Sequence, residues 1–242
     1  MQRSKLFWKK FLIVLVSWLF IFSGLWISLA FKYIKFNNFY DEALIFISNN
    51  YNSCTILVGV LTLPFLCSLY FLFESNQSCE LVRYKARDNY ILKNLFYGIE
   101  FSIAFALIHG MVNLIGLKLS FNSDMFATVN LYEYCIINAI VMAAYYARCS
   151  NMYTLAISVI DRKYAIIWLT TLYFLSSVII KMNFPQIWLP CNDVTIFMRL
   201  LSCDVDAFNI CLIITREIVL GIGFGVAALL VFNKKDVVTY DK

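Results

Sequence analysis

The side chains best able to do chemistry in this sequence are ionisable and amide groups that stand inside long apolar stretches. A charged residue at the centre of a membrane helix costs about 2.5–3.5 kcal/mol on insertion scales, so it marks a binding site, an ion pathway or an internal ion pair. The candidates are Glu100, His109, Asn113, Arg148, Asn151, Arg216 and Glu217.

Arg148 lies near the middle of its apolar stretch, and Asn151 follows about one helical turn later. Three interpretations of Arg148 stay open: a lining residue of a substrate cavity, an internal ion pair with Glu100, and a side chain that snorkels towards the membrane surface. Arg216 and Glu217 are adjacent, so on a helix their side chains point about 100° apart. We interpret them as anchors at the membrane interface rather than as a relay.

His109 is the only histidine, and Asn113 follows it one turn later. This HxxxN spacing resembles a fragment of the intramembrane CAAX-type proteases. That family also needs a paired-glutamate motif with a downstream arginine and a second histidine, which this sequence lacks. We therefore predict that His109 is a hydrogen-bonded residue of a helix bundle.

No convergent set of acid, base, nucleophile and metal ligands occurs in the sequence, which argues against an enzyme. There is no GxxxxGK[ST] loop, so ATP and Mg²⁺ would have to be bound by another chain. The eight cysteines include no CxxC pair, and we expect no metal site. Cys191 and Cys203 could form a disulfide in an oxidising compartment, although a reduced pair is the preferred interpretation.

The elements that must position these residues follow from composition. The chain is 62% hydrophobic and 14% charged, whereas soluble domains carry about 25% charged residues. Its apolar runs are long enough to span a bilayer, and they lack the alternation of barrel strands. We predict an all-α polytopic membrane protein, one domain over residues 1–242, with six helical spans at about 11–31, 54–73, 97–117, 131–160, 164–182 and 209–232.

Two spans contain residues that bear on their geometry. Pro64 is expected to kink the second span. Gly221 and Gly225 give the sixth span small residues at helix-contact spacing, and both close packing inside the bundle and a dimer contact stay open. The first run covers 21 residues, more than the ~7–15 of a signal peptide, so we predict a retained span.

Basic residues indicate the orientation of the bundle, because cytoplasmic connections carry an excess of Lys and Arg. Most of them fall before the first span, between spans two and three, between spans four and five, and after the sixth. The opposite connections hold only Lys32, Lys35, Lys118, Lys181 and Arg199. Both termini are therefore expected in the cytoplasm.

Residues 79–95, CELVRYKARDNYILKNL, form the longest charged stretch with an unbroken helical pattern. The stretch has no Gly or Pro and lies between two apolar spans, which predicts an amphipathic helix at the cytoplasmic membrane surface. Its basic side chains could contact a protein partner, or they could anchor the chain to anionic lipid.

The segment 82–95 is similar to the VRYxSRxxW-type segment of small bacterial permeases of type-2 ATP-binding-cassette exporters, with Ala86 in place of the usual Ser. The segment 161–171, DRKYAIIWLTT, resembles the inner turn that these permeases place before span five. The resemblance implies that 79–95 is the coupling helix, that 2–10 is an interface helix, and that the apolar 183–208 connection forms outer hairpin helices. It assigns ATPase coupling to Arg83, Tyr84, Lys85, Arg87 and Tyr90.

The same resemblance implies a permease in the bacterial cell membrane that moves an amphipathic substrate, such as a peptide antibiotic, a bacteriocin or a lipid-like molecule. The expected partners are ATP-binding-cassette ATPase subunits, a second permease subunit and membrane lipid, and no nucleic acid. The alternative is a stand-alone immunity or sensor protein that binds a peptide at its outer loops.

Overall fold

The computed structural model describes residues 2–34, 47, 50–73, 87–120, 131–181, 190–202 and 204–234, and every regular element in this part of the chain is helical. The elements, in chain order, are α1 (Gln2–Ile34), the π-helix η1 (Thr55–Val60), α3 (Thr62–Leu72), α5 (Arg87–Ser120), α7 (Leu131–Val159), α8 (Arg162–Lys181), the 3₁₀-helix η2 (Pro190–Thr195), α9 (Ile196–Leu201) and α10 (Ala207–Lys234).

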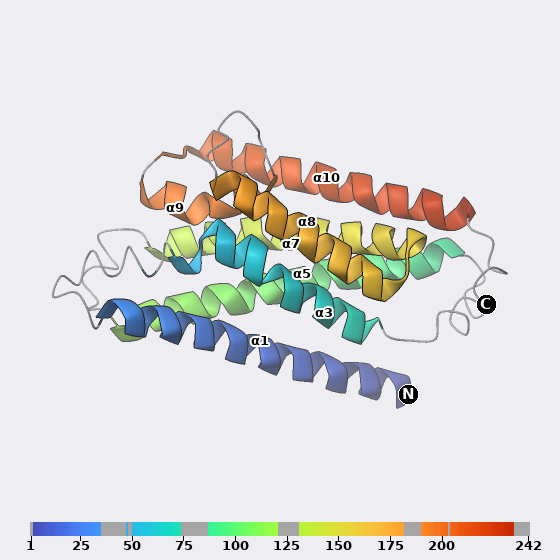
Figure 1. Cartoon of the computed structure of the whole chain (residues 1–242), viewed down its shortest axis with the longest axis horizontal. Coiled ribbons are helices and arrows are strands. Elements are labelled where there is room, and N and C mark those ends of the chain that lie inside the picture. The colour runs from blue at the N-terminus through green and yellow to red at the C-terminus, as the bar shows by residue number, and fades with distance from the viewer. Residues whose placement is uncertain are drawn as a thin grey trace.

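The long helices form an elongated bundle in which α1 begins and α10 ends at the same end (Figure 1). We call this the terminal end, and the end that carries α9 the distal end. Helix α7 packs against both α5 and α10, while α1 packs against α5 and α3. Each predicted span corresponds to one helix or, for the second span, to η1 followed by α3.

Four helical segments of the described chain are long and apolar enough to cross a membrane. They are Trp8–Phe31, Thr55–Leu72, Asn89–Leu119 and Ala207–Lys234. Helices α7 and α8 do not meet the same criteria of length and hydropathy. Helix α7 contains Glu133, Asn138, Arg148 and Asn151, which lower its hydropathy although the last three are buried by its neighbours.

Phe105 of α5 is the centre of the largest apolar cluster. Its ring makes edge-on contacts with Trp18 and Phe22 of α1, at centroid distances of 4.7 and 5.0 Å. Phe65 of α3 and Tyr146 of α7 contact the same ring at 5.1 and 4.6 Å. One aromatic side chain thus joins four helices, in the edge-to-face geometry that aromatic quadrupoles favour.

The second span is irregular upstream of Pro64, as its sequence predicts. Proline lacks an N–H and its ring clashes with the carbonyl four residues earlier, here Val60, the last residue of η1. The Leu61 N–H bonds to Ile56 O at 2.8 Å, a spacing of five residues. The hydroxyl of Tyr146 donates to Leu57 O at 2.5 Å, which satisfies one carbonyl of this irregular turn.

Two predicted surface helices are partly wrong in their boundaries. Residues 87–95, expected in a separate coupling helix, are the first turns of α5, which runs unbroken for 34 residues. Residues 2–10, expected as an interface helix, are likewise the first turns of α1. Charged residues did not interrupt either helix, because Lys and Arg are good helix formers. Residues 79–86 lie outside the described part of the chain.

The connection before α10 folds onto the distal end of the bundle. Ile196, Phe197 and Leu200 of α9 are buried, and Ile196 and Leu200 cluster with Val141 of α7 and Ile213 of α10. The apolar composition of the predicted 183–208 hairpin is therefore explained, in its described part, by burial against the chain's own helices.

Candidate functional site

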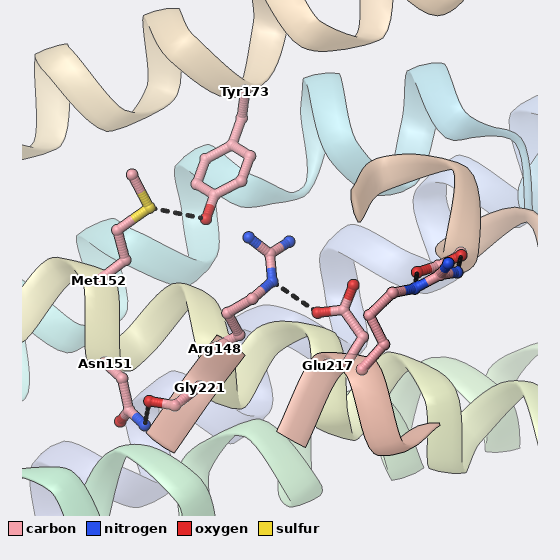
Figure 2. Close-up of polar contacts among 8 residues, drawn as sticks. Arg148, Asn151, Met152, Tyr173, Glu217 and Gly221 are labelled. Atoms are coloured by element: carbon pink, nitrogen blue, oxygen red, sulfur yellow. Dashed lines mark hydrogen bonds and ion pairs between the residues drawn. The ribbon is translucent and has the colours of Figure 1, made fainter. Parts of the chain in front are cut away.

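Arg148 of α7 and Glu217 of α10 form an ion pair inside the bundle. Arg148 Nε donates to Glu217 Oε2 at 2.5 Å, and the two residues are 4% and 0% exposed. Figure 2 shows the two side chains reaching towards each other between their helices. This pair corrects two predictions: Arg148 does not pair with Glu100, which is exposed on α5, and Glu217 is not an interfacial anchor.

Small residues on α10 bring its backbone close enough for this contact. A Cβ atom added to Gly221, one turn after Glu217, would lie 3.6 Å from Arg148 Cα. Asn151 Nδ2 donates to the Gly221 carbonyl at 2.9 Å (Figure 2). Gly225 faces Leu95 of α5 and Asn151, whereas a Cβ on Gly223 would meet nothing within 4 Å. Gly221 and Gly225 thus serve packing within the chain, as small residues do between membrane helices.

Aromatic faces enclose the guanidinium of Arg148. Its Cζ lies 4.8 Å from the ring centroid of Tyr145 and 5.9 Å from that of Tyr173. Tyr173 comes from α8, and its hydroxyl donates to Met152 Sδ at 3.4 Å (Figure 2). Because a cation is attracted to the face of an aromatic ring, these tyrosines stabilise the charge where water is excluded. We call Tyr145, Arg148, Asn151, Tyr173, Glu217 and Gly221 the polar core.

A second ion pair lies beside the polar core. Arg216 Nε donates to Asp193 Oδ2 at 2.9 Å, and Nη2 of the same guanidinium pairs with Oδ1. Asp193 of η2 is 2% exposed, so this bidentate pair fastens the distal connection to α10. Adjacent residues on a helix point about 100° apart. Arg216 and Glu217 therefore engage two different elements, and the prediction that both are surface anchors is wrong.

His109 and Asn113 lie apart from these ion pairs, on α5. The His109 ring stacks on Tyr51 at 4.3 Å and 12°, and Phe22 meets it edge-on at 5.3 Å. Neither ring nitrogen has a hydrogen-bond partner among the described residues. The Tyr51 hydroxyl donates to the backbone carbonyl of His109 at 3.5 Å, so the residue is hydrogen-bonded through its carbonyl while aromatic contacts hold its ring. A hydrogen bond to the imidazole itself stays a prediction. Asn113 Nδ2 donates to Cys135 Sγ at 3.8 Å. We call His109, Tyr51, Phe22 and Asn113 the histidine cluster.

The residues proposed for ATPase coupling are only partly described. Arg83, Tyr84 and Lys85 lie outside the described residues, and Arg87 is described only as the first residue of α5. Tyr90 is 3% exposed, and its ring stacks with Phe232 of α10 at a centroid distance of 6.0 Å. Its side chain is therefore engaged within the chain.

The predicted cysteine pair also falls outside the described region, since residue 203 and the side chain of Cys191 are not described.

Three members of this arrangement were missed by sequence reasoning. Tyr145 precedes Arg148 by three residues and so shares its helix face, which is a usable signal. Asp193 follows Pro190 in a segment interpreted only as apolar. Tyr173 has no local signal at all, because nothing in α8 indicates that this tyrosine faces α7.

The polar core joins α7 to α10 through an ion pair and a hydrogen bond. Opposite charges neutralise each other, and no group of three or more His, Cys, Asp or Glu side chains within the described ranges could hold a metal ion. Breaking a buried ion pair by removing one partner typically costs about 3–5 kcal/mol. The contact therefore holds α7 and α10 in one relative position.

No protein-family model matches the chain, and no similar chain was found among curated proteins or solved structures.

Proposed function

We propose that this chain is the membrane-spanning permease subunit of an ATP-binding-cassette exporter. In this proposal α1, η1 with α3, α5, α7, α8 and α10 make six crossings of the bacterial cell membrane, and the terminal end faces the cytoplasm. A separate ATPase binds ATP and Mg²⁺, and a second permease subunit completes the transporter. The cargo is an amphipathic molecule such as a peptide antibiotic, a bacteriocin or a lipid-like compound.

Six crossings are supported by where α7 places its polar side chains. Helix α7 has 29 residues, or about 43 Å at 1.5 Å per residue, which exceeds the ~30 Å hydrocarbon core. Asn138, Arg148 and Asn151 are all buried by neighbouring helices, so they would not meet lipid. Polar side chains in membrane bundles face the interior in this way. An even number of crossings also agrees with the start of α1 and the end of α10 at one end (Figure 1).

The observation that carries the proposal is the continuity of α5. Its 34 residues extend about 51 Å, roughly 20 Å more than the hydrocarbon core needs. The helix begins within the charged 79–95 stretch and continues into the bundle. A force applied by an ATPase at that stretch would therefore move the whole helix rather than a flexible connection.

The first turns of α5 are also packed against α10. Tyr90, Ile91 and Leu95 form one apolar cluster with Ala228, and Phe232 packs against it. Movement of α5 would therefore displace α10, which carries Glu217. The Arg148–Glu217 pair would resist this displacement until ATP binding supplies the energy, and it would re-form when the ATPase resets.

Purification of the full chain from its native membrane tests the proposal. We expect an ATPase subunit with a P-loop to co-purify in a stoichiometric ratio, and we expect Arg83→Glu with Arg87→Glu to abolish that association. The matched control is Lys163→Glu with Lys234→Glu, which changes the charge equally at the terminal end, where both side chains are exposed. This control should leave the association intact.

Two outcomes would contradict the proposal. If no ATPase co-purifies from membranes in which the chain is functional, the stand-alone immunity or sensor protein becomes the better account. If an ATPase co-purifies and Arg83→Glu with Arg87→Glu leaves that association intact, the 79–95 stretch does not contact the ATPase and binds anionic lipid instead.

A further inference from the structure

A groove runs along the surface of the bundle between α5 and α7. Its volume is about 380 Å³, and its walls are apolar side chains, among them Leu107 and Met111 of α5 and Ile136 and Ile140 of α7. Gly110 and Ala139 lie at its floor, where a Cβ on Gly110 would meet Ala139 Cβ at 3.6 Å. The groove exists because two small residues let the helices approach while larger side chains stand up on both sides.

The dimensions of the groove match one leaflet of a bilayer. On α5 it extends from Ile103 to Leu114, a rise of eleven residue steps or about 16 Å along the helix. Half of a ~30 Å hydrocarbon core is about 15 Å. These residues fall within the Asn89–Leu119 segment that is long and apolar enough to cross a membrane. The medium around the groove is therefore hydrocarbon, and its long axis follows the direction of acyl chains.

The distal end of the groove carries groups suited to a lipid headgroup. Lys118 lies one turn beyond Leu114 on the same side of α5, and Tyr132 lies one turn before Ile136 on α7. Both side chains are exposed. An ammonium group binds phosphate, and tyrosine is enriched at the level of membrane headgroups.

We propose that this groove is a binding site for one glycerophospholipid of the distal leaflet, with an acyl chain between α5 and α7 and the phosphate at Lys118. An extended peptide in the same position would leave its backbone amides without partners, because the groove walls offer no hydrogen-bonding side chain beyond the thiol of Cys135. The site stands whether or not the chain works with an ATPase.

Photolabelling tests the site directly. The full chain is reconstituted in vesicles of phosphatidylethanolamine and phosphatidylglycerol that contain a trace of phosphatidylglycerol with a diazirine on its acyl chain. We expect labelling within 103–114 and 135–143 to exceed labelling of the exposed α10 surface around Ile222 and Val226 by at least about fivefold, a difference of roughly 1 kcal/mol in affinity.

Substitution of Ala139 should then remove the label. Ala139→Phe fills the groove and should lower the labelling of the groove to the level of α10. Gly223→Phe is placed where a Cβ meets open space, and it should change neither the labelling of the groove nor that of α10. Because Ala139→Phe could disturb folding, Lys118→Glu provides a second variant on an exposed residue. It should reduce labelling about threefold, and Lys118→Arg should retain it.

Two results would overturn the proposal. Equal labelling of the groove and of α10 in the wild type would show ordinary contact with bulk lipid. An unlabelled groove, together with an Ile136→Cys variant that forms disulfide-linked dimers in membranes, would show that a second copy of the chain occupies it.

Discussion

The polar core and the histidine cluster bury polar side chains in one bundle by opposite means. At the α7–α10 contact, Arg148 Nε donates to Glu217 Oε2, while Arg148 Nη2 and Glu217 Oε1 have no hydrogen-bond partner among the described residues. At His109, both ring nitrogens lack partners among the described residues, and stacking on Tyr51 holds the ring. A charge removed from water needs a counter-charge, whereas a neutral imidazole tolerates an apolar setting at smaller cost. The first contact therefore couples two helices strongly, and the second fills space.

The largest test of this comparison removes one charge from the polar core. Glu217→Ala should destabilise the protein by about 3–5 kcal/mol, because Arg148 stays buried without a counter-charge. The measurement is the midpoint of thermal unfolding of the purified chain in detergent. The control is the double variant Arg148→Met with Glu217→Leu, which removes both charges and should recover most of the lost stability. Equal midpoints for wild type and Glu217→Ala would show that the pair contributes nothing.

A smaller effect is expected from moving the two helices of the polar core apart. Gly221→Leu introduces a side chain against Arg148 Cα and should cost about 1–3 kcal/mol by overpacking. Gly223→Leu adds the same side chain two residues later, on another face of α10, where it meets open space, and should leave the midpoint nearly unchanged. If Gly221→Leu and Gly223→Leu have the same unfolding midpoint, close approach of α10 to α7 does not contribute to stability.

The smallest effect should come from the histidine cluster. His109→Phe keeps an aromatic ring against Tyr51 and Phe22 and removes two polar atoms without partners, so it should change stability by less than about 1 kcal/mol. His109→Ala removes the ring and should cost more, because a cavity remains. A loss for His109→Phe as large as that for His109→Ala would indicate a hydrogen bond to the imidazole in the folded protein.

The sequence predicted the all-helical class, because apolar runs of about 20 residues leave few alternatives in a membrane protein. Four helical segments of the described chain are long and apolar enough to cross a membrane, and six crossings stay a prediction. The interruption near Pro64 was predictable for the same kind of local reason, since proline cannot donate the bond that a regular helix needs at that position.

Tertiary pairing was the part that the sequence could not supply. Glu217 lies 69 residues from Arg148, and only the rotation of both helices decides that they meet. Glu100 was a candidate partner although its depth matched that of Arg148 only loosely, and it lies on an exposed face of α5. The predicted end of the coupling helix at residue 95 was wrong for a related reason. The 79–95 stretch has helical composition throughout, so nothing in it indicates that residues 87–95 continue the next span.

The separation of Arg148 and Glu217 along the sequence also bears on how the protein is made. Residues are synthesised in order, so Arg148 leaves the ribosome before Glu217, which follows 69 residues later. In the six-span arrangement α7 therefore reaches the insertion channel with an arginine near its centre and no carboxylate to neutralise it, at a cost of about 2.5–3.5 kcal/mol. Helix α7 would remain beside the channel or only partly inserted until α10 emerges. Synthesis of α10 would thus complete the insertion of α7.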